Sequence, residues 1–241
     1  MNMKRFGLNL GEKSTFGAMD DASANRSAPM SGRGAASTDF TDVNGAAVNG
    51  TDVDCDVLVI GGGPTGSTAA ALLARRGWRV LCLEKAHHPR FHIGESLLPM
   101  NLPILERLGV LEAVEAIGIR KIGADFPKPM MGDGTDTPGA TNVFRFDRAL
   151  YPVPDHAFQV RRDEFDTLLF ENARAAGADT RDGVTVVTVE FGGDGRPAQA
   201  RARSEDGREF AIRMRYLLDA SGRDTFLGNR FKTKRKHERH Q

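Results

Sequence analysis

Cysteine, tryptophan and long hydrophobic runs are all scarce in this chain of 241 residues. The two cysteines, Cys55 and Cys82, are too few for a disulfide framework, and both stand in short apolar runs typical of buried strands. We therefore expect reduced thiols in the core of a cytoplasmic protein. No segment approaches the roughly 18 consecutive apolar residues that a membrane-spanning helix needs. The basic N-terminus has no apolar segment behind it, which argues against a secretory signal.

An excess of charge of one sign is also missing. The 33 lysines and arginines nearly balance the 32 aspartates and glutamates, for a formal net charge of +1. This balance argues against nucleic acid or an anionic membrane as a partner, and we expect the basic run at 232–239 to be a solvated surface segment. A metal site at the histidines of "HHPRFH" (87–92) would need preorganised geometry and usually a further carboxylate or thiolate, so we expect none.

The composition divides the chain into two regions. Residues 1–52 are rich in small and polar residues and bury too little apolar surface to offset the entropy of ordering, so we expect a disordered leader. The character changes at Cys55, where short apolar runs and helix-forming stretches begin. We assign residues 53–241 to one folded α/β domain.

A glycine-rich turn stands between a predicted strand and a predicted helix. The strand is "CDVLVI" (55–60), the helix is "TGSTAAALLARRG" (65–77), and a second strand, "WRVLCLE" (78–84), follows. This β-turn-α-β unit is the context in which a G-x-G-x-x-G pattern indicates a dinucleotide site.

Each glycine of the pattern has its own expected role. Gly61 permits the tight turn, Gly63 lets the backbone approach a pyrophosphate, and Gly66 lets the helix pack close to the strand. Pro64 and Thr65 stand at the start of the helix, where N–H groups and the helix dipole favour an anion. We expect all five residues to belong to a cofactor site.

An acidic residue ends the second strand. Glu84 stands where a carboxylate accepts hydrogen bonds from the ribose hydroxyls of an adenosine. Its charge disfavours a 2′-phosphate, so FAD or NAD is expected in preference to NADP. We include its neighbour Lys85 in the predicted site.

Two further helices and a meander are expected downstream. Apolar residues at helical spacing predict helices over 101–118 and 162–178. The segments 184–191, 198–204 and 209–221 are typical of a three-stranded β-meander with turns at "GGDGRP" and "EDGR".

Three motifs favour FAD over NAD. "HPRFHIGESLLP" (88–99), "FQVRRDEFDTLL" (158–169) and "YLLDASGRDTFLG" (216–228) stand in this order after the glycine turn. Together they resemble flavin-dependent halogenases and related flavin monooxygenases and geranylgeranyl-reductase-like enzymes. The resemblance covers about residues 54–240. It implies an FAD-binding Rossmann-type, glutathione-reductase-like domain of three layers with a β-meander.

The resemblance also implies site residues. Gly94, Glu95 and Ser96 of "GESLLP" would lie beside the flavin, and Asp219 and Gly222 belong to the strand-end element near it. The guanidinium groups of Arg90 and Arg162 suit pyrophosphate oxygens or flavin carbonyls. Either arginine is also explained as a structural ion-pair residue.

Lys121 is the candidate catalytic residue. It stands in "IRKIGADF", a context similar to that of the family's active-site lysine, which positions hypohalous acid or forms a chloramine with it. An ammonium donates hydrogen bonds and loses a proton when it is partly desolvated. The alternative is a solvated lysine near a helix end.

The implied reaction uses reduced FAD, O₂ and halide to form hypohalous acid, which halogenates an electron-rich aromatic compound. A phenol, pyrrole or indole, free or tethered to a carrier, is the expected substrate, and a separate NADH-dependent flavin reductase is the expected partner. The alternatives are a flavin hydroxylase, a geranylgeranyl-reductase-like reductase, and an inactive fragment or nucleotide-binding module.

Two family motifs are absent from the sequence. Neither the W-x-W-x-x-P element of halogenases nor the superfamily's G-D-A element occurs. In the family both lie downstream of the matched region. We therefore expect 53–241 to be the N-terminal part of an FAD-binding domain that stops before the substrate domain.

Overall fold

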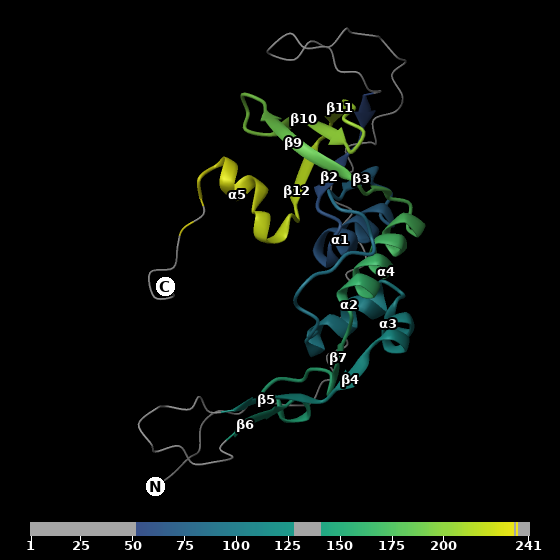
Figure 1. The fold of residues 1–241 in the computed structure, drawn as a ribbon, viewed down its shortest axis with the longest axis vertical. Helices are drawn as coiled ribbons and strands as arrows, with labels where there is room; N and C mark the ends of the chain where they lie inside the picture. Colours follow the sequence, from purple (N-terminus) through teal and green to yellow (C-terminus); the bar gives the residue numbers. More distant parts are fainter. Residues whose placement is uncertain (1–51, 128–140, 234, 236–241) are drawn as a thin grey trace, which may run out of the picture. The chain divides into compact units, whose positions relative to one another are not determined.

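The computed structural model describes residues 52–127, 141–233 and 235 (Figure 1). All of the leader except Asp52, and most of the basic run at 232–239, lie outside these residues, so both expectations stay predictions. Among the described residues, no helix combines the length and the apolar character that a membrane crossing requires.

A four-stranded parallel sheet forms the central layer. Its strands lie in the order β12, β2, β3, β8, and each neighbouring pair is parallel. The strands are β2 Val57–Ile60, β3 Val80–Leu83, β8 Asp179–Arg181 and β12 Tyr216–Asp219. Every residue of β2 and β3 is buried, as expected for strands that are covered on both faces.

Two helices, α1 Pro64–Ala74 and α4 Arg162–Ala175, cover one face of this sheet. Two shorter helices, α2 Leu102–Arg107 and α3 Leu111–Ile117, extend the same hydrophobic core, and α3 packs against α4. Helices α1 and α4 pack side by side (Figure 1). The buried side of α1 consists of small residues, Gly66, Ser67, Ala70 and Ala71, which allow a close approach to the sheet.

A second sheet covers the other face. It has the strand order β1, β11, β10, β9, with antiparallel pairs β11–β10 and β10–β9. Its strands are β1 Val53–Asp54, β9 Val184–Phe191, β10 Pro197–Ser204 and β11 Glu209–Arg213. The turns of the meander contain Gly195 and Gly207, both at positive φ.

Alternate residues of β2 and β3 belong to two separate cores. Val59 and Cys82 pack with the helices, whereas Leu58 and Leu81 pack with the antiparallel sheet. This is the two-residue period of a strand buried between two layers. The predicted three-layer α/β domain with a β-meander is confirmed.

Two predicted elements are each split in the structure. The strand predicted over 209–221 is wrong as one unit, because β11 and β12 belong to different sheets. Between them, the N–H groups of Arg215 and Tyr216 both donate to the carbonyl oxygen of Asp56, at 3.1 and 2.9 Å. The helix predicted over 101–118 is interrupted at Gly109, whose φ of +67° ends α2 before α3 begins.

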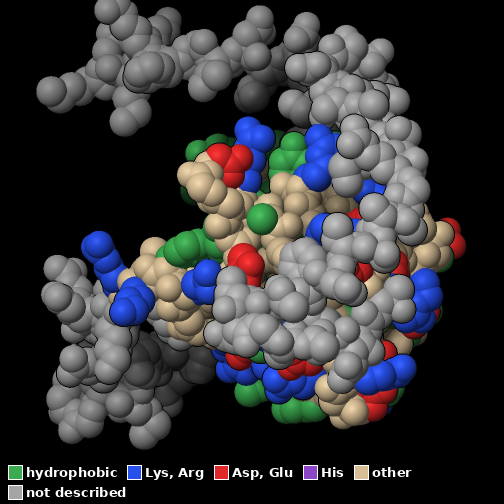
Figure 2. Space-filling view, turned by 90° about the horizontal axis from the view of Figure 1, so that it is seen from above, with side chains coloured by type: hydrophobic (Ala, Val, Ile, Leu, Met, Phe, Trp, Pro, Cys, Tyr) green, Lys and Arg blue, Asp and Glu red, His purple; other side chains and the backbone are tan. Residues whose placement is uncertain are grey.

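Several short elements were not predicted. Two antiparallel pairs join β4 Ile119–Lys121 to β7 Ala157–Gln159 and β5 Gly123–Pro127 to β6 Thr141–Arg145. The others are the 3-10 turns η1 Pro99–Asn101, η2 Phe146–Arg148 and η3 Gly222–Asp224, and the helix α5 Phe226–Arg230. On the face drawn in Figure 2, basic and acidic side chains are interspersed over the described surface.

Candidate functional site

The glycine turn between β2 and α1 is closely packed at three of its four glycines, Gly61, Gly62 and Gly66. Gly61 has a φ of +102°, and a Cβ there would lie 2.5 Å from the carbonyl oxygen of Ala220. A Cβ on Gly66 would lie 1.8 Å from the carbonyl oxygen of Gly61. The backbone therefore packs so closely around Gly61 and Gly66 that neither position has room for a side chain.

Gly63 lines a groove, as Gly61 also does, but it is not closely packed. Its φ of −75° suits any residue, and an added Cβ would meet only Nη2 of Arg90, at 3.4 Å. Helix α1 begins at the next residue, Pro64, and no side chain caps its N-terminus. The first-turn N–H groups of a helix have no intrahelical acceptors, so this end of α1 suits an anion.

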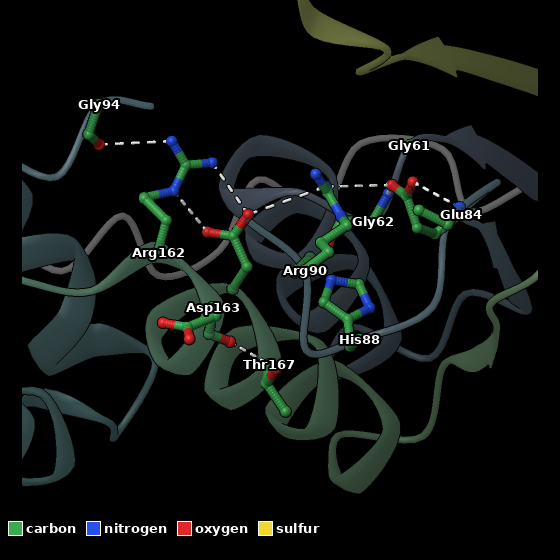
Figure 3. Close-up of polar contacts among 12 residues, drawn as sticks. Gly61, Gly62, Glu84, His88, Arg90, Gly94, Arg162, Asp163 and Thr167 are labelled. Carbon is green, nitrogen blue, oxygen red and sulfur yellow. Dashed lines mark hydrogen bonds and ion pairs between the residues drawn. The ribbon is translucent and has the colours of Figure 1, made fainter. Parts of the chain in front are cut away.

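Glu84 is connected to the glycine turn. Its carboxylate is buried and accepts hydrogen bonds from the N–H groups of Gly62 (2.8 Å) and Ala86 (3.1 Å). Nη2 of Arg90 lies 3.3 Å from the same Oε2 that Gly62 contacts (Figure 3). The acidic side chain therefore has a fixed orientation at the end of β3, where the sequence places a ribose contact.

Both predicted arginines are held by one buried carboxylate. Arg162 makes a two-pronged bond to Asp166, with Nε at 2.7 Å and Nη2 at 2.9 Å from its oxygens. Nη2 of Arg90 lies 3.8 Å from Oδ2 of Asp166. Both arginines therefore form the ion pairs that the structural alternative proposed. Both also line the groove, so the ion pairs do not exclude contact with a ligand there.

The groove has a volume of about 740 Å³, within the usual range of cofactor sites. It is lined by nine of the predicted residues, Gly61, Gly63, Pro64, Thr65, Glu84, Lys85, Arg90, Arg162 and Gly222. At its rim Lys85 forms an ion pair with Asp224, which joins the end of β3 to η3.

The "GESL" segment lies outside this lining. The carbonyl oxygens of Ile93 and Gly94 accept hydrogen bonds from Nη1 of Arg162, at 2.9 and 3.3 Å. Ser96 forms an isolated antiparallel bridge with Gln159, whose side-chain amide donates to Glu95 at 3.3 Å. The predicted flavin contacts of Gly94, Glu95 and Ser96 stay predictions.

Lys121 lies beside the same segment. Its ammonium donates hydrogen bonds to the hydroxyl of Ser96 and to the carbonyl oxygen of Leu97, and it lies 5.5 Å from the ring centroid of Phe146. Burial lowers the pKa of Lys121 below its ordinary value. The side chain is therefore partly buried and oriented by two hydrogen bonds, and its catalytic role stays a prediction.

Asp219 organises the turn that follows β12. Its carboxylate accepts hydrogen bonds from the N–H of Ser221 (3.0 Å), the hydroxyl of Ser221 (2.5 Å) and the N–H of Leu227 (2.8 Å). It does not line the groove, whereas Gly222, at a φ of +63°, does. Asp219 therefore shapes this wall of the groove from behind.

Asp166 was not predicted as a site residue. Its i,i+4 spacing from Arg162 on a predicted helix is the signal that indicates such a pair. The position of His88 was not predicted either: its ring stacks on Phe170, with ring centroids 4.6 Å apart. Burial lowers the pKa of His88 and raises those of the Cys55 and Cys82 thiols to about 12.

The residues present fit an adenine dinucleotide. A Cβ-free position faces the groove at Gly63, the N-terminus of α1 follows it, and Nε of Arg90 is buried with no hydrogen-bond partner. Anionic phosphate oxygens are the acceptors that such donors take. In the described part of the chain, no group of three or more His, Cys, Asp or Glu side chains has an arrangement that would hold a metal ion.

The fold and the groove together define a dinucleotide-binding α/β protein in which the glycine turn forms one wall of the site. The chain belongs to a family of known proteins: the model described as "FAD binding domain" matches residues 54–241. FAD is thus confirmed as the cofactor, in preference to NAD.

Individual relatives are flavin-dependent halogenases. The chain is 40% identical over 176 residues to the tryptophan 2-halogenase of Chondromyces crocatus, which covers 73% of this chain and 31% of that protein. It is 36% identical over 191 residues to the 1H-pyrrole-2-carbonyl-(peptidyl-carrier protein) chlorinase of Pseudomonas fluorescens, with coverages of 75% and 42%. The predicted resemblance to halogenases is confirmed.

A solved structure agrees with the fold. The myxobacterial chondrochloren halogenase CndH superposes with a TM-score of 0.63 at 36% identity, covering 72% of this chain and 38% of that protein. The chain therefore spans between 31% and 42% of the length of these three relatives.

Proposed function

We propose that this chain is the FAD-binding portion of a flavin-dependent halogenase that acts on an electron-rich aromatic compound. The carrying observation is the fixed ammonium of Lys121, which hydrogen-bonds within the "GESL" segment of a chain homologous to halogenases. When bound, reduced FAD supplies the two electrons with which O₂ and halide give hypohalous acid and water.

The groove residues would bind the adenosine diphosphate half of FAD. The N–H groups at the start of α1 would face the pyrophosphate, and the absence of a side chain at Gly63 would allow close approach. Glu84 would accept a hydrogen bond from the ribose. Arg90 and Arg162, which line the groove, would offer cationic donors to the phosphates.

Lys121 would act on the oxidised halide. Its three N–H donors exceed the two protein oxygens that it contacts, so one N–H remains to hold hypohalous acid. In the neutral amine, which the lowered pKa of Lys121 favours, the nitrogen lone pair and not a third N–H would meet the hypohalous acid. Gly94, Glu95 and Ser96 would form the adjoining wall beside the flavin ring, and Asp219 would shape the opposite turn.

The proposed partners follow from the reaction. Two-electron reduction of FAD requires a donor, and we propose a separate NADH-dependent flavin reductase. The substrate would be a phenol, a pyrrole or an indole. The Pseudomonas relative supports a carrier-tethered substrate, because its name describes a pyrrole-2-carbonyl group on a peptidyl-carrier protein.

The test is product formation with FAD, a flavin reductase, NADH, O₂ and either chloride or bromide. Halogenated phenol, pyrrole or indole, detected by mass spectrometry, supports a halogenase, and a hydroxylated product that forms without halide supports the hydroxylase instead. Lys121→Ala should abolish halogenation while FAD reoxidation continues. Arg120→Ala is the matched control, because Arg120 is the neighbouring strand residue and pairs instead with Asp155. Equal halogenation by Lys121→Ala would contradict the role of this lysine.

A further inference from the structure

A row of alternating charges joins helix α4 to the glycine turn. Arg162 bonds to Asp166, Asp166 lies 3.8 Å from Arg90, and Arg90 lies 3.3 Å from Glu84. Glu84 in turn accepts the N–H of Gly62 at 2.8 Å (Figure 3). Asp166 is therefore the point at which α4 is connected to the wall that would receive the adenosine diphosphate.

Asp166 itself is inaccessible to any ligand. Its side chain is 0% exposed, whereas those of Arg90 and Arg162 are 13% and 14% exposed and border the groove. A carboxylate this deeply buried requires cationic partners, and the two arginines supply them. Any effect of Asp166 on a ligand in the groove must therefore act through these arginines.

The geometry fixes the position of Arg90 in particular. Its Nη2 atom is within 4 Å of both Glu84 and Asp166, and it lies 3.4 Å from the place where a Cβ on Gly63 would be. The guanidinium is thus held beside the turn that faces the pyrophosphate. Without Asp166, Glu84 would be the one carboxylate of the described residues that pairs with this side chain.

We infer that Asp166 is a positioning residue for the cofactor: it holds Arg90 and Arg162 at the groove so that they present donors to the diphosphate, and it does so without touching the ligand. This inference rests on the proposed function of the groove. A supporting carboxylate of this kind determines ligand affinity through the orientation of the groups that do make contact.

Two opposite expectations make the inference testable. If Asp166 only neutralises charge, its removal leaves the groove more positive and strengthens the binding of an anionic diphosphate. If Asp166 positions the arginines, its removal weakens that binding even though the charge becomes more favourable. The sign of the change in affinity therefore separates the two roles.

The probe is ADP, titrated calorimetrically into the chain at fixed salt concentration. Asp166→Asn keeps the shape of the side chain but cannot accept the two-pronged bond of Arg162, and we expect its affinity for ADP to fall about tenfold. The matched control is Asp163→Asn, which removes one negative charge from the same helix at a residue paired with the exposed Arg161. Its ADP affinity should stay within about twofold of the wild type.

A double substitution tests the route through Arg90. If Asp166 acts through Arg90, then Asp166→Asn should weaken ADP binding less in an Arg90→Gln background than in the wild type. Should Asp166→Asn fail to fold by circular dichroism, Arg162→Lys replaces it, because lysine keeps the charge but cannot form the two-pronged bond. That variant should bind ADP at least about tenfold more weakly, on the order expected for one lost charge-assisted hydrogen bond.

The outcomes separate the inference from the proposed function. A wild-type chain that does not bind ADP would overturn the proposed groove. A wild-type chain that binds ADP, together with an Asp166→Asn variant that binds it equally or more tightly, would overturn the inference alone.

Discussion

The ammonium of Lys121 donates a hydrogen bond to the hydroxyl of Ser96, a residue 25 positions earlier in the chain. This contact joins β4 to the segment that follows the cofactor groove, and a second bond of 2.7 Å to the carbonyl oxygen of Leu97 reinforces it. The proposed catalytic side chain is therefore oriented by two neighbouring groups of one segment.

The lowered pKa of Lys121 predicts enhanced nucleophilicity. At a pH between its pKa and that of an ordinary lysine, about 10.4, a larger fraction of Lys121 is neutral amine. Competitive labelling with an amine-reactive reagent, followed by peptide mass spectrometry, should show a pH profile displaced to lower pH. A profile equal to that of a free lysine would contradict the assignment.

Alanine substitutions at Gly63 and Gly66 should have different effects on stability and on FAD binding. Gly63→Ala places a methyl group in the groove, where only Arg90 is near, so the melting temperature should change little while FAD affinity falls at least tenfold. Gly66→Ala forces α1 away from the turn and should destabilise the fold by about 3 kcal/mol or more. Thermal melts and FAD titrations of both variants check this; equal melting temperatures would refute the packing role of Gly66.

His87 predicts a pH-dependent contact between three loops. Its Nδ1 atom lies 3.4 Å from Asp182 and its Nε2 atom 2.9 Å from Glu205. Both nitrogens can donate to these carboxylates at the same time only when the ring is protonated. The hydrogen bonds to these carboxylates raise the pKa of His87. Because the folded state binds this proton more tightly, the stabilisation is complete below about pH 6.5 and disappears as the pH rises through the raised pKa.

An NMR titration of the His87 ring measures this directly. The midpoint should lie above that of an unperturbed histidine and should move down in Glu205→Gln. A His92→Gln variant serves as a control, since burial lowers the pKa of His92 and that ring takes no part in the contact. An unshifted midpoint for His87 would contradict its interaction with Asp182 and Glu205.

Much of the site was predictable because its signals are local. The glycine spacing and the position of Glu84 after a strand specify one end of the groove, and Gly61, Gly63 and Glu84 line it in the structure. The continuous apolar run at 55–60 likewise indicated a buried strand, and the structure covers that strand on both faces. These features depend on residues within one supersecondary unit.

What the sequence did not indicate depends on contacts between distant segments. The split between β11 and β12 arises from the carbonyl of Asp56, more than 150 residues away, and no local pattern marks it. The link from Asp166 through Arg90 to Glu84 joins a helix, a loop and a strand end. Periodicity identifies the helix but does not show which side chains meet across the groove.

An apolar surface on the β5–β6 pair predicts association of the isolated chain. Phe126 and Phe144 are each more than half exposed, and their ring centroids lie 5.6 Å apart. Contiguous exposed apolar side chains bind hydrophobic dyes and promote aggregation. The chain should enhance the fluorescence of anilinonaphthalene sulfonate, and Phe126→Thr combined with Phe144→Thr should reduce that signal. An undiminished signal would show that the dye binds somewhere other than the β5–β6 pair, contrary to this prediction.

The most direct test of the central claim, that the groove binds the adenosine diphosphate half of FAD, is an amide NMR titration of the chain with FAD, ADP and FMN. FMN lacks the adenosine, so the account predicts shifts at the amides of Gly63, Thr65 and Lys85 with FAD and with ADP, and none of comparable size with FMN. Equal shifts with FMN, or no shifts at these amides with saturating FAD, would contradict it.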